Sequence, residues 1–209
     1  YQGCSDLGNG KYKDLFEALV AGWRANFTYA EKLPVILTEI APHCIGSTEK
    51  RMKDGETEKP TWSVTADMRM TLNQLGEEVA DCGTVSLLDL GEPDIHPIRK
   101  EEVGARWCAW ALQHVYGKAL EGSSPVVASV DWKGVKAVLK LKNAKGLRTR
   151  DGKAVKGFEL AGPPVATTGK DGKPTDAVTY YYAKAVIVGD TIELTCPQVK
   201  EAFGVRYAW

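Results

Sequence analysis

Apolar residues recur in the first part of the chain at the spacing of a helix and then of a buried strand. Between residues 12 and 27 they return every three or four positions, which predicts a helix with one apolar face formed by Leu15, Phe16, Leu19, Val20, Trp23 and Phe27. Residues 33–41, LPVILTEIA, are short, rich in β-branched side chains and almost continuously apolar. That pattern is typical of a strand covered on both faces, as in a parallel sheet.

The order of helix and strand repeats further along the chain. Residues 62–80 carry apolar side chains at roughly helical spacing, and residues 83–91, GTVSLLDLG, predict a second buried strand. A third helix is expected over residues 98–117, with Gly117 as its C-terminal stop. Residues 43–61 are polar, charged and punctuated by glycine, which indicates a long surface loop. Helices that alternate with buried strands predict an α/β domain.

The pattern changes near residue 121. From there onward the chain consists of short alternating segments such as VVASVDW, GVKAVLKLK and AVTYYYAKAVIVG, which glycine-rich turns separate. Such segments are typical of an antiparallel sheet. We therefore expect an α/β domain over residues 1–120 and a small antiparallel β domain, a sandwich or an open barrel, over residues 121–209.

Composition and charge narrow the range of partners. The chain has 27 basic and 27 acidic residues, and a formal net charge of zero provides no general attraction for nucleic acid or an anionic membrane. A neutral or sugar-like partner fits this balance better. No apolar run is long enough to span a membrane. The five cysteines form no C-x-x-C pair. His114 has no acid at metal-ligand spacing and His43 heads the charged loop, so we expect these two histidines and His96 to form no metal site.

The segment GEPDIHP, residues 91–97, directly follows the second predicted strand. In parallel α/β sheets, ligands and catalytic groups gather beyond the carboxyl ends of the strands. His96 is therefore a candidate general base toward a hydroxyl nucleophile. Asp94, two residues earlier, is the candidate acid that would fix the tautomer of His96 through Nδ1.

Other interpretations of this segment stay open at the level of sequence. Glu92 and Asp89 are rival acids for His96. Alternatively, Asp94 caps the following helix, Pro97 lies in the first turn of that helix, and His96 is only solvated.

The amino-terminal sequence YQGCSDLGNGKY contains a second candidate group. Gln2 and Gly3 could direct a side-chain amide and a backbone N–H at a developing oxyanion. The alternative is that these two residues simply form a turn.

Several segments, taken in order, resemble one known family. They are YQG-SD at the amino terminus, Y-DLFEALVAGWR, LLDLGEPDIHPIRKEEVGARW, GFELAG and VRYAW. In this order they are similar to the sialate O-acetylesterase family of carbohydrate esterases, within the SGNH-type hydrolases. The resemblance covers nearly the whole chain, and DIHP followed by VRYAW is fairly specific.

The resemblance implies part of an SGNH/flavodoxin-like, parallel three-layer α/β domain, followed by the small antiparallel β domain. In the family a serine attacks the acetyl carbonyl, the histidine of the IHP motif is the base, and a glutamine in a QGES motif helps to hold the oxyanion. By motif, these roles pass to His96 with Asp94 and to Gln2 with Gly3. The implied substrate is an acetylated carbohydrate, no cofactor is needed, and the setting is secreted, periplasmic or lysosomal. Sialic acid, xylan and other acetylated glycans stay open.

Two departures from the family pattern affect this expectation. Cys4 stands where family members usually have glutamate, and a thiol replaces the hydrogen bonds of a carboxylate poorly. The family's nucleophilic serine lies upstream of the Tyr-Gln-Gly motif, and no serine of this chain matches its position. We therefore expect the nucleophile upstream of Tyr1 or on an N-terminal companion chain that completes the sheet. The alternative is a catalytically incompetent fragment or a non-catalytic carbohydrate-binding or interaction module.

Overall fold

The computed structural model describes residues 1–27, 32–42, 63–91, 94–168 and 173–208. These residues form two compact units, which divide between Ser124 and Pro125. The first unit contains the helices α1 (Tyr12–Asn26), α3 (Val64–Glu78) and α4 (Lys100–His114), a 3₁₀ turn at Cys4–Asp6, and the strands β1 (Val35–Thr38) and β2 (Cys82–Val85). The predicted order of helices and strands in this part of the chain is confirmed.

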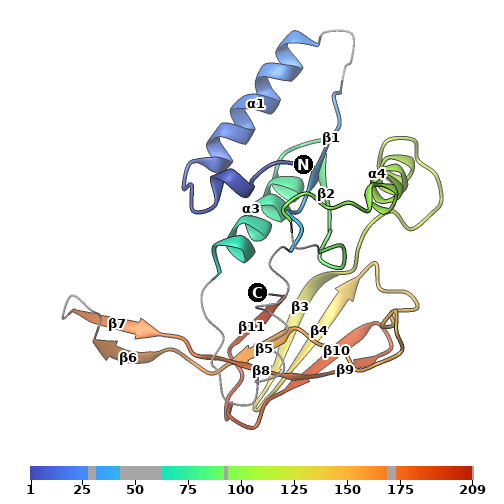
Figure 1. Ribbon diagram of the computed structural model, residues 1–209. Coiled ribbons are helices and arrows are strands. Elements are labelled where there is room, and N and C mark those ends of the chain that lie inside the picture. Colours follow the sequence, from blue (N-terminus) through green and yellow to red (C-terminus); the bar gives the residue numbers. More distant parts are fainter. Residues whose placement is uncertain (28–31, 43–62, 92–93, 169–172, 209) are drawn as a thin grey trace. The chain divides into compact units, whose positions relative to one another are not determined.

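The two strands of the first unit are parallel. Val35 lies opposite Cys82 and Thr38 lies opposite Val85. Because α3 connects them, β1, α3 and β2 make one strand–helix–strand crossover unit (Figure 1).

Close backbone approaches hold a helix against each face of this strand pair. A Cβ atom on Gly76 of α3 would lie 2.1 Å from Oγ1 of Thr84, and a Cβ atom on Gly83 would lie 2.2 Å from the ring of Trp110 on α4. Successive residues of a strand point to opposite faces. Since Thr84 meets α3 and Gly83 meets α4, the two helices cover opposite faces of β2.

Helix α1 packs on the same face as α3, but only along part of its apolar surface. Tyr12 joins a buried cluster that includes Leu37 of β1 and Met68, Leu72 and Leu75 of α3. The sequence predicts one apolar face for this helix, and the structure divides that face in two. Of the predicted face, Val20 is buried and Phe16 is half-buried against this cluster, whereas Leu15, Leu19, Trp23 and the C-cap residue Phe27 are exposed.

The second predicted strand is shorter than its apolar run indicates. Strand β2 ends at Val85, and the chain then turns, because Leu90 N–H donates to the Leu87 carbonyl and Leu88 N–H donates to Ser86 Oγ. Leu87 and Leu90 are nevertheless fully buried, in a cluster that includes Ala41 and Val103 of α4. The run is apolar because a turn in the core needs apolar side chains as much as a strand does.

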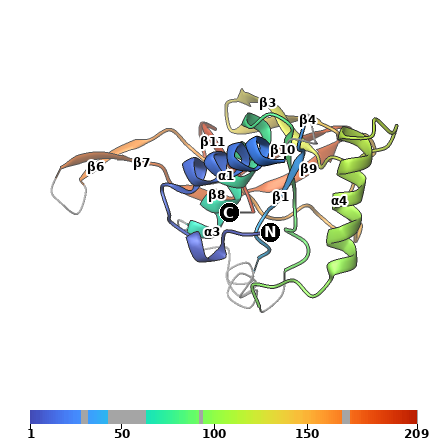
Figure 2. The same ribbon diagram turned by 90° about the horizontal axis from the view of Figure 1, so that it is seen from above.

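The second unit is built from antiparallel strands, as the sequence predicts. Its larger sheet has the order β3-β4-β10-β9 and its smaller sheet the order β11-β5-β8, and one core cluster takes side chains from both. A separate hairpin, β6-β7, extends away from these sheets in both views (Figures 1 and 2). The strands are β3 (Val126–Lys133), β4 (Lys136–Lys142), β5 (Phe158–Ala161), β6 (Val165–Thr168), β7 (Pro174–Ala177), β8 (Tyr180–Tyr182), β9 (Lys184–Val188), β10 (Thr191–Thr195) and β11 (Gly204–Tyr207).

The motifs GFELAG and VRYAW meet in the smaller sheet as strands β5 and β11. Arg206 lies opposite Glu159 in the register, and its Nη2 is 2.6 Å from the Glu159 Oε2 atom. The guanidinium carbon is also 3.7 Å from the centre of the Tyr180 ring. These two sequence motifs therefore have a structural role in the second unit.

Candidate active site

The loop that follows β2 brings Asp94 and His96 into contact. The Asp94 Oδ1 atom is 2.9 Å from His96 Nδ1 and also accepts the His96 backbone N–H at 2.8 Å. One carboxylate oxygen thus fixes both the backbone turn and the ring. Both side chains are largely exposed to solvent, and none of the described residues forms a hydrogen bond with the other ring nitrogen, Nε2. This is the arrangement that a general base requires: an oriented ring with one nitrogen open to a reactant.

The helix-cap interpretation of Asp94 is wrong. Helix α4 begins at Lys100, its N-cap position is Arg99, and no side chain caps it. Asp94 lies farther from the helix and binds His96 instead. Pro97 is fully buried in the loop rather than in the first turn of the helix.

One rival acid is held elsewhere. Asp89 forms an ion pair with Arg106 of α4 at 2.7 Å, and the Arg99 guanidinium donates to its backbone carbonyl at 2.7 Å. The other rival, Glu92, lies outside the described residues. Among the described residues, Asp94 is the carboxylate in contact with His96.

Gly3 and Gln2 lie in the segment that leads into the 3₁₀ turn. Gly3 is buried and has a φ of +135°, a backbone conformation that residues other than glycine rarely adopt. The side-chain Nε2 of Gln2 donates to Asp6 Oδ2 at 2.5 Å, and the backbone carbonyl of Gln2 accepts from the Tyr12 hydroxyl at 3.3 Å. The contact with Asp6 uses one of the two amide N–H bonds of Gln2. The segment is thus a constrained turn whose amide is oriented by a carboxylate.

Tyr1 connects this segment with the His96 loop. Its hydroxyl donates to the Ile95 carbonyl at 2.6 Å, and Ile95 lies between Asp94 and His96. Gln2 with Gly3 and Asp94 with His96, which are far apart in sequence, therefore lie in neighbouring segments.

Cys4 lies between an apolar cluster and the Tyr1 hydroxyl. It is half-buried and packs against the apolar cluster of Tyr12, Leu37 and Ile40. A carboxylate at this position would need a polar partner in place of these contacts.

Sequence reasoning missed a buried carboxylate at the carboxyl end of β1. Glu39 accepts from Asn73 Nδ2 of α3 at 2.6 Å and from Ser86 Oγ, just after β2, at 2.5 Å. It thereby ties α3 and the ends of both strands together at the base of the His96 loop. The available signal was an acid inside the apolar run LPVILTEIA, because a buried acid needs partners.

A second histidine contact was also missed. His114 Nε2 is 2.7 Å from Ser123 Oγ, and Ser123 also donates to Gln113 Oε1 at 3.3 Å. The His114 ring stacks on Trp110, and no carboxylate among the described residues contacts it. The pair lacks the acid that would orient the imidazole as a base.

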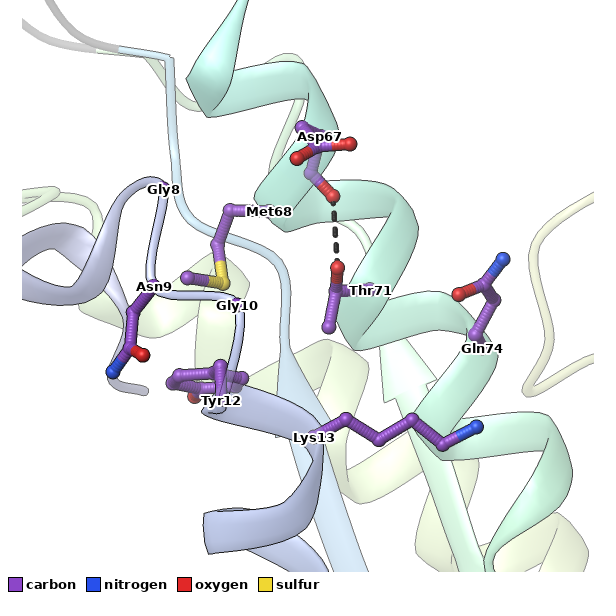
Figure 3. A pocket seen from close by; sticks show the side chains of 9 residues that line it. All are labelled: Gly8, Asn9, Gly10, Tyr12, Lys13, Asp67, Met68, Thr71 and Gln74. Carbon is purple, nitrogen blue, oxygen red and sulfur yellow. Dashed lines mark hydrogen bonds between the residues drawn. The ribbon is translucent and has the colours of Figure 1, made fainter.

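A hollow of about 190 Å³ lies beside the turn that follows Gly3 (Figure 3). The turn at residues 8–10 forms one side and α3 the other, with Asp67, Thr71 and Gln74 along the helix. Neither His96 nor Asp94 lines it. This space is therefore separate from the histidine, and no chemistry is assigned to it.

In the described part of the chain, no group of three or more histidine, cysteine, aspartate and glutamate side chains could hold a metal ion. His43 lies outside that part. None of its helices has the length and apolarity that crossing a membrane requires.

One solved structure gives the chain a known relative. The chain is similar to the crystal structure of a carbohydrate acetylesterase from Xanthomonas citri, with 28% sequence identity and a TM-score of 0.73. The match covers 98% of this chain and 42% of that protein, so the chain spans less than half of the solved acetylesterase. No protein-family model and no curated protein matches the sequence significantly. The similarity supports a relationship to carbohydrate esterases.

Proposed function

We propose that this chain is the base-bearing part of a carbohydrate O-acetylesterase of the sialate O-acetylesterase type, with an SGNH-type serine mechanism. The observation that carries the proposal is the contact between His96 Nδ1 and Asp94 Oδ1, at 2.9 Å, in the loop beyond a parallel strand. The similarity to a carbohydrate acetylesterase adds support, because it extends over 98% of the chain.

In the proposed reaction, His96 Nε2 takes the proton of a serine hydroxyl while the serine oxygen attacks the acetyl carbonyl carbon. The Gln2 amide and the Gly3 N–H face the oxyanion that forms. The imidazolium then gives its proton to the sugar oxygen as the bond between that oxygen and the acetyl carbon breaks. Water, activated by His96, hydrolyses the acetyl-enzyme and releases acetate. Asp94 stabilises the imidazolium throughout.

The nucleophilic serine would come from outside this chain's described residues. Among them, no serine hydroxyl lies within hydrogen-bond distance of His96. We assign it to a preceding segment or to an N-terminal companion chain.

The surface of α1 and the edge of β1 support such a partner. In the described part of the chain, β1 pairs with β2 alone. Since α1 and α3 pack on one face and crossovers are right-handed, a parallel strand that leads into α1 would lie beside β1, on the side away from β2. The exposed residues Leu15, Leu19 and Trp23 of α1 would then cover that added strand. The partner would thus complete the three-layer domain.

The proposed substrate is an acetylated sialic acid or a related acetylated sugar, and the proposed setting is secreted, periplasmic or lysosomal. A neutral chain suits a carbohydrate partner. The second candidate function, a non-catalytic carbohydrate-binding module of the same fold, is favoured by one observation, which is that no described serine contacts His96.

Hydrolysis of p-nitrophenyl acetate tests the proposal. The assay compares wild type, His96→Ala and the control His114→Ala, each alone and mixed with the candidate partner segment. We expect activity in the mixture, a 10²- to 10⁴-fold lower kcat for His96→Ala, and an unchanged kcat for His114→Ala.

A fluorophosphonate probe, which labels activated serines, then locates the nucleophile by peptide mass spectrometry. The label should appear on the partner segment and should depend on His96. Full activity of a lone 22.8 kDa chain, with the label on one of its own serines, would contradict the assignment of the nucleophile. No hydrolysis in any mixture would favour the binding module.

A further inference from the structure

The Tyr1 hydroxyl joins three segments that are distant in the sequence. It donates a hydrogen bond to the Ile95 carbonyl at 2.6 Å and accepts one from the Ala41 N–H at 3.4 Å. A phenol has one donor and can also accept, so both bonds form at once. The ring itself belongs to the segment that continues into Gln2 and Gly3.

Ala41 provides a rigid reference point. It lies just beyond β1, is fully buried, and packs with Leu87, Leu90 and Val103. The strand end next to it is fixed by a hydrogen bond from Glu39 N–H to the Val85 carbonyl at 3.0 Å. A group bonded to the Ala41 N–H is therefore held relative to the ends of both parallel strands.

The Ile95 carbonyl links the His96 loop to Tyr1. The Asp94–His96 contact spans two residues, so it fixes the ring relative to its own turn but not relative to the rest of the site. Pro97 is buried and holds one side of the turn. The Tyr1 hydroxyl bonds to the carbonyl of Ile95, which lies between Asp94 and His96, and to the Ala41 N–H beyond β1. These bonds connect the turn to the strand ends.

The other side of the site is anchored through the backbone of Tyr1. Gly3 is buried, and a Cβ atom there would be 3.4 Å from the Met68 side chain and 3.5 Å from Ile40. The position of Gly3 is thus set by the core. Tyr1 lies two residues before Gly3 and its hydroxyl bonds to Ile95. It therefore links the Gln2–Gly3 segment to the loop that carries His96.

We propose that Tyr1 is a positioning residue, which fixes His96 relative to Gln2 and Gly3 through its hydrogen bonds to Ile95 and Ala41. The proposal rests on the proposed esterase function for its kinetic consequence. A misplacement of about 1 Å between reacting groups can lower a rate about 100-fold.

The hydroxyl keeps its proton over the neutral range. Burial raises the pKa of the Tyr1 phenol above its ordinary value; the Ala41 N–H acts in the opposite direction, and the neighbouring Cys4 and Asp94 raise the pKa further. The bond to the Ile95 carbonyl is therefore available at every pH at which a histidine base works.

The test is Tyr1→Phe, with Tyr116→Phe as the matched control. Phenylalanine keeps the ring and removes only the hydroxyl, while Tyr116 is a strongly exposed tyrosine beyond the end of α4. In the preparation that hydrolyses p-nitrophenyl acetate, we expect Tyr1→Phe to lower kcat about 10- to 100-fold with KM within about twofold. The apparent pKa of kcat/KM should stay at the wild-type value, since the Asp94–His96 contact is local. Tyr116→Phe should match wild type.

Nuclear magnetic resonance on the chain itself gives an independent measurement. In wild type, the backbone order parameters of residues 94–96 should be close to those of the helices, about 0.85, and they should fall below about 0.6 in Tyr1→Phe. Exchange of the Ala41 amide should become faster, while the melting temperature stays within about 5 °C of wild type.

Each outcome decides the proposal. Unchanged order parameters at residues 94–96, or an unchanged kcat in an active preparation, would overturn it. If wild type hydrolyses no acetyl ester in any mixture, the esterase proposal fails, and the order parameters alone decide whether Tyr1 holds the loop.

Discussion

The buried ion pair between Glu159 and Arg206 gives a quantitative prediction for the second unit. The side chains are 4% and 11% exposed, the Arg206 Nε atom is 2.9 Å from Glu159 Oε2, and Arg206 lies over the Tyr180 ring. Glu159→Ala would remove the carboxylate that faces the buried guanidinium. We expect the free energy of unfolding to fall by about 3–5 kcal/mol, the usual cost of removing one member of a buried ion pair.

Removing both charges should be far less harmful than removing one. Burial raises the pKa of Glu159 while Arg206 acts in the opposite direction, so the cost of desolvation offsets the attraction between the charges. The double variant Glu159→Leu with Arg206→Met should therefore lie within about 1 kcal/mol of wild type or be more stable.

The raised pKa also fixes the sign of the pH dependence. The folded protein binds the proton of Glu159 more tightly than the unfolded chain does. The stability that this group contributes is fully present below the ordinary glutamate pKa of about 4.3 and is lost as the pH rises through the folded-state value. Relative to Glu159→Gln, which does not titrate, wild type should lose stability as the pH rises above the ordinary glutamate pKa of about 4.3.

The assay must report on the second unit alone, because two units can unfold separately. Hydrogen exchange of peptides that contain strands β5 and β11, followed during a urea titration, meets this requirement. A loss below about 1 kcal/mol for Glu159→Ala, or a double variant as unstable as the single one, would refute the reasoning.

Two glycine substitutions test the first unit by thermal unfolding. Gly83→Ala should lower the free energy of unfolding by about 1–3 kcal/mol or more, because its Cβ atom would lie 2.2 Å from the Trp110 ring. The control Gly104→Ala, in open space on the same helix as Trp110, should be neutral or stabilising. Equal effects of the two substitutions would exclude close packing of α4 on β2. Gly3→Ala should lower the free energy of unfolding by about 1–3 kcal/mol because of the φ of +135° at this position, and Gly10→Ala is the unstrained control. A Gly3→Ala variant as stable as wild type would show that this backbone conformation is not needed.

Local contacts of the candidate site could be predicted from the sequence. Asp94 and His96 are two residues apart, so a single tight turn is enough to bring them together, and the structure has that turn. The nature of the acid could not be decided without the fold. Asp89 was excluded by its ion pair with Arg106, which lies on a helix 17 residues later.

Contacts between distant segments could not be predicted in the same way. Tyr1 and Ile95 are 94 residues apart, and no periodicity relates them. Glu39 and Ser86 each follow a strand, but only the parallel register of β1 and β2 shows that the two strand ends are neighbours. The apolar stripe of α1 predicted a helix correctly but not how much of it would be covered.

The sequence by itself determined the order of helices and strands, the change to antiparallel strands in the second half, and the candidates His96 and Asp94. These features depend on spacings within a few residues, which the chain carries directly. The tertiary structure alone decided that the Tyr1 hydroxyl bonds to the His96 loop, that Glu39 joins the strand ends, and that GFELAG and VRYAW form a buried ion pair. Such contacts depend on which strand edges and faces meet, and packing of the whole unit sets that.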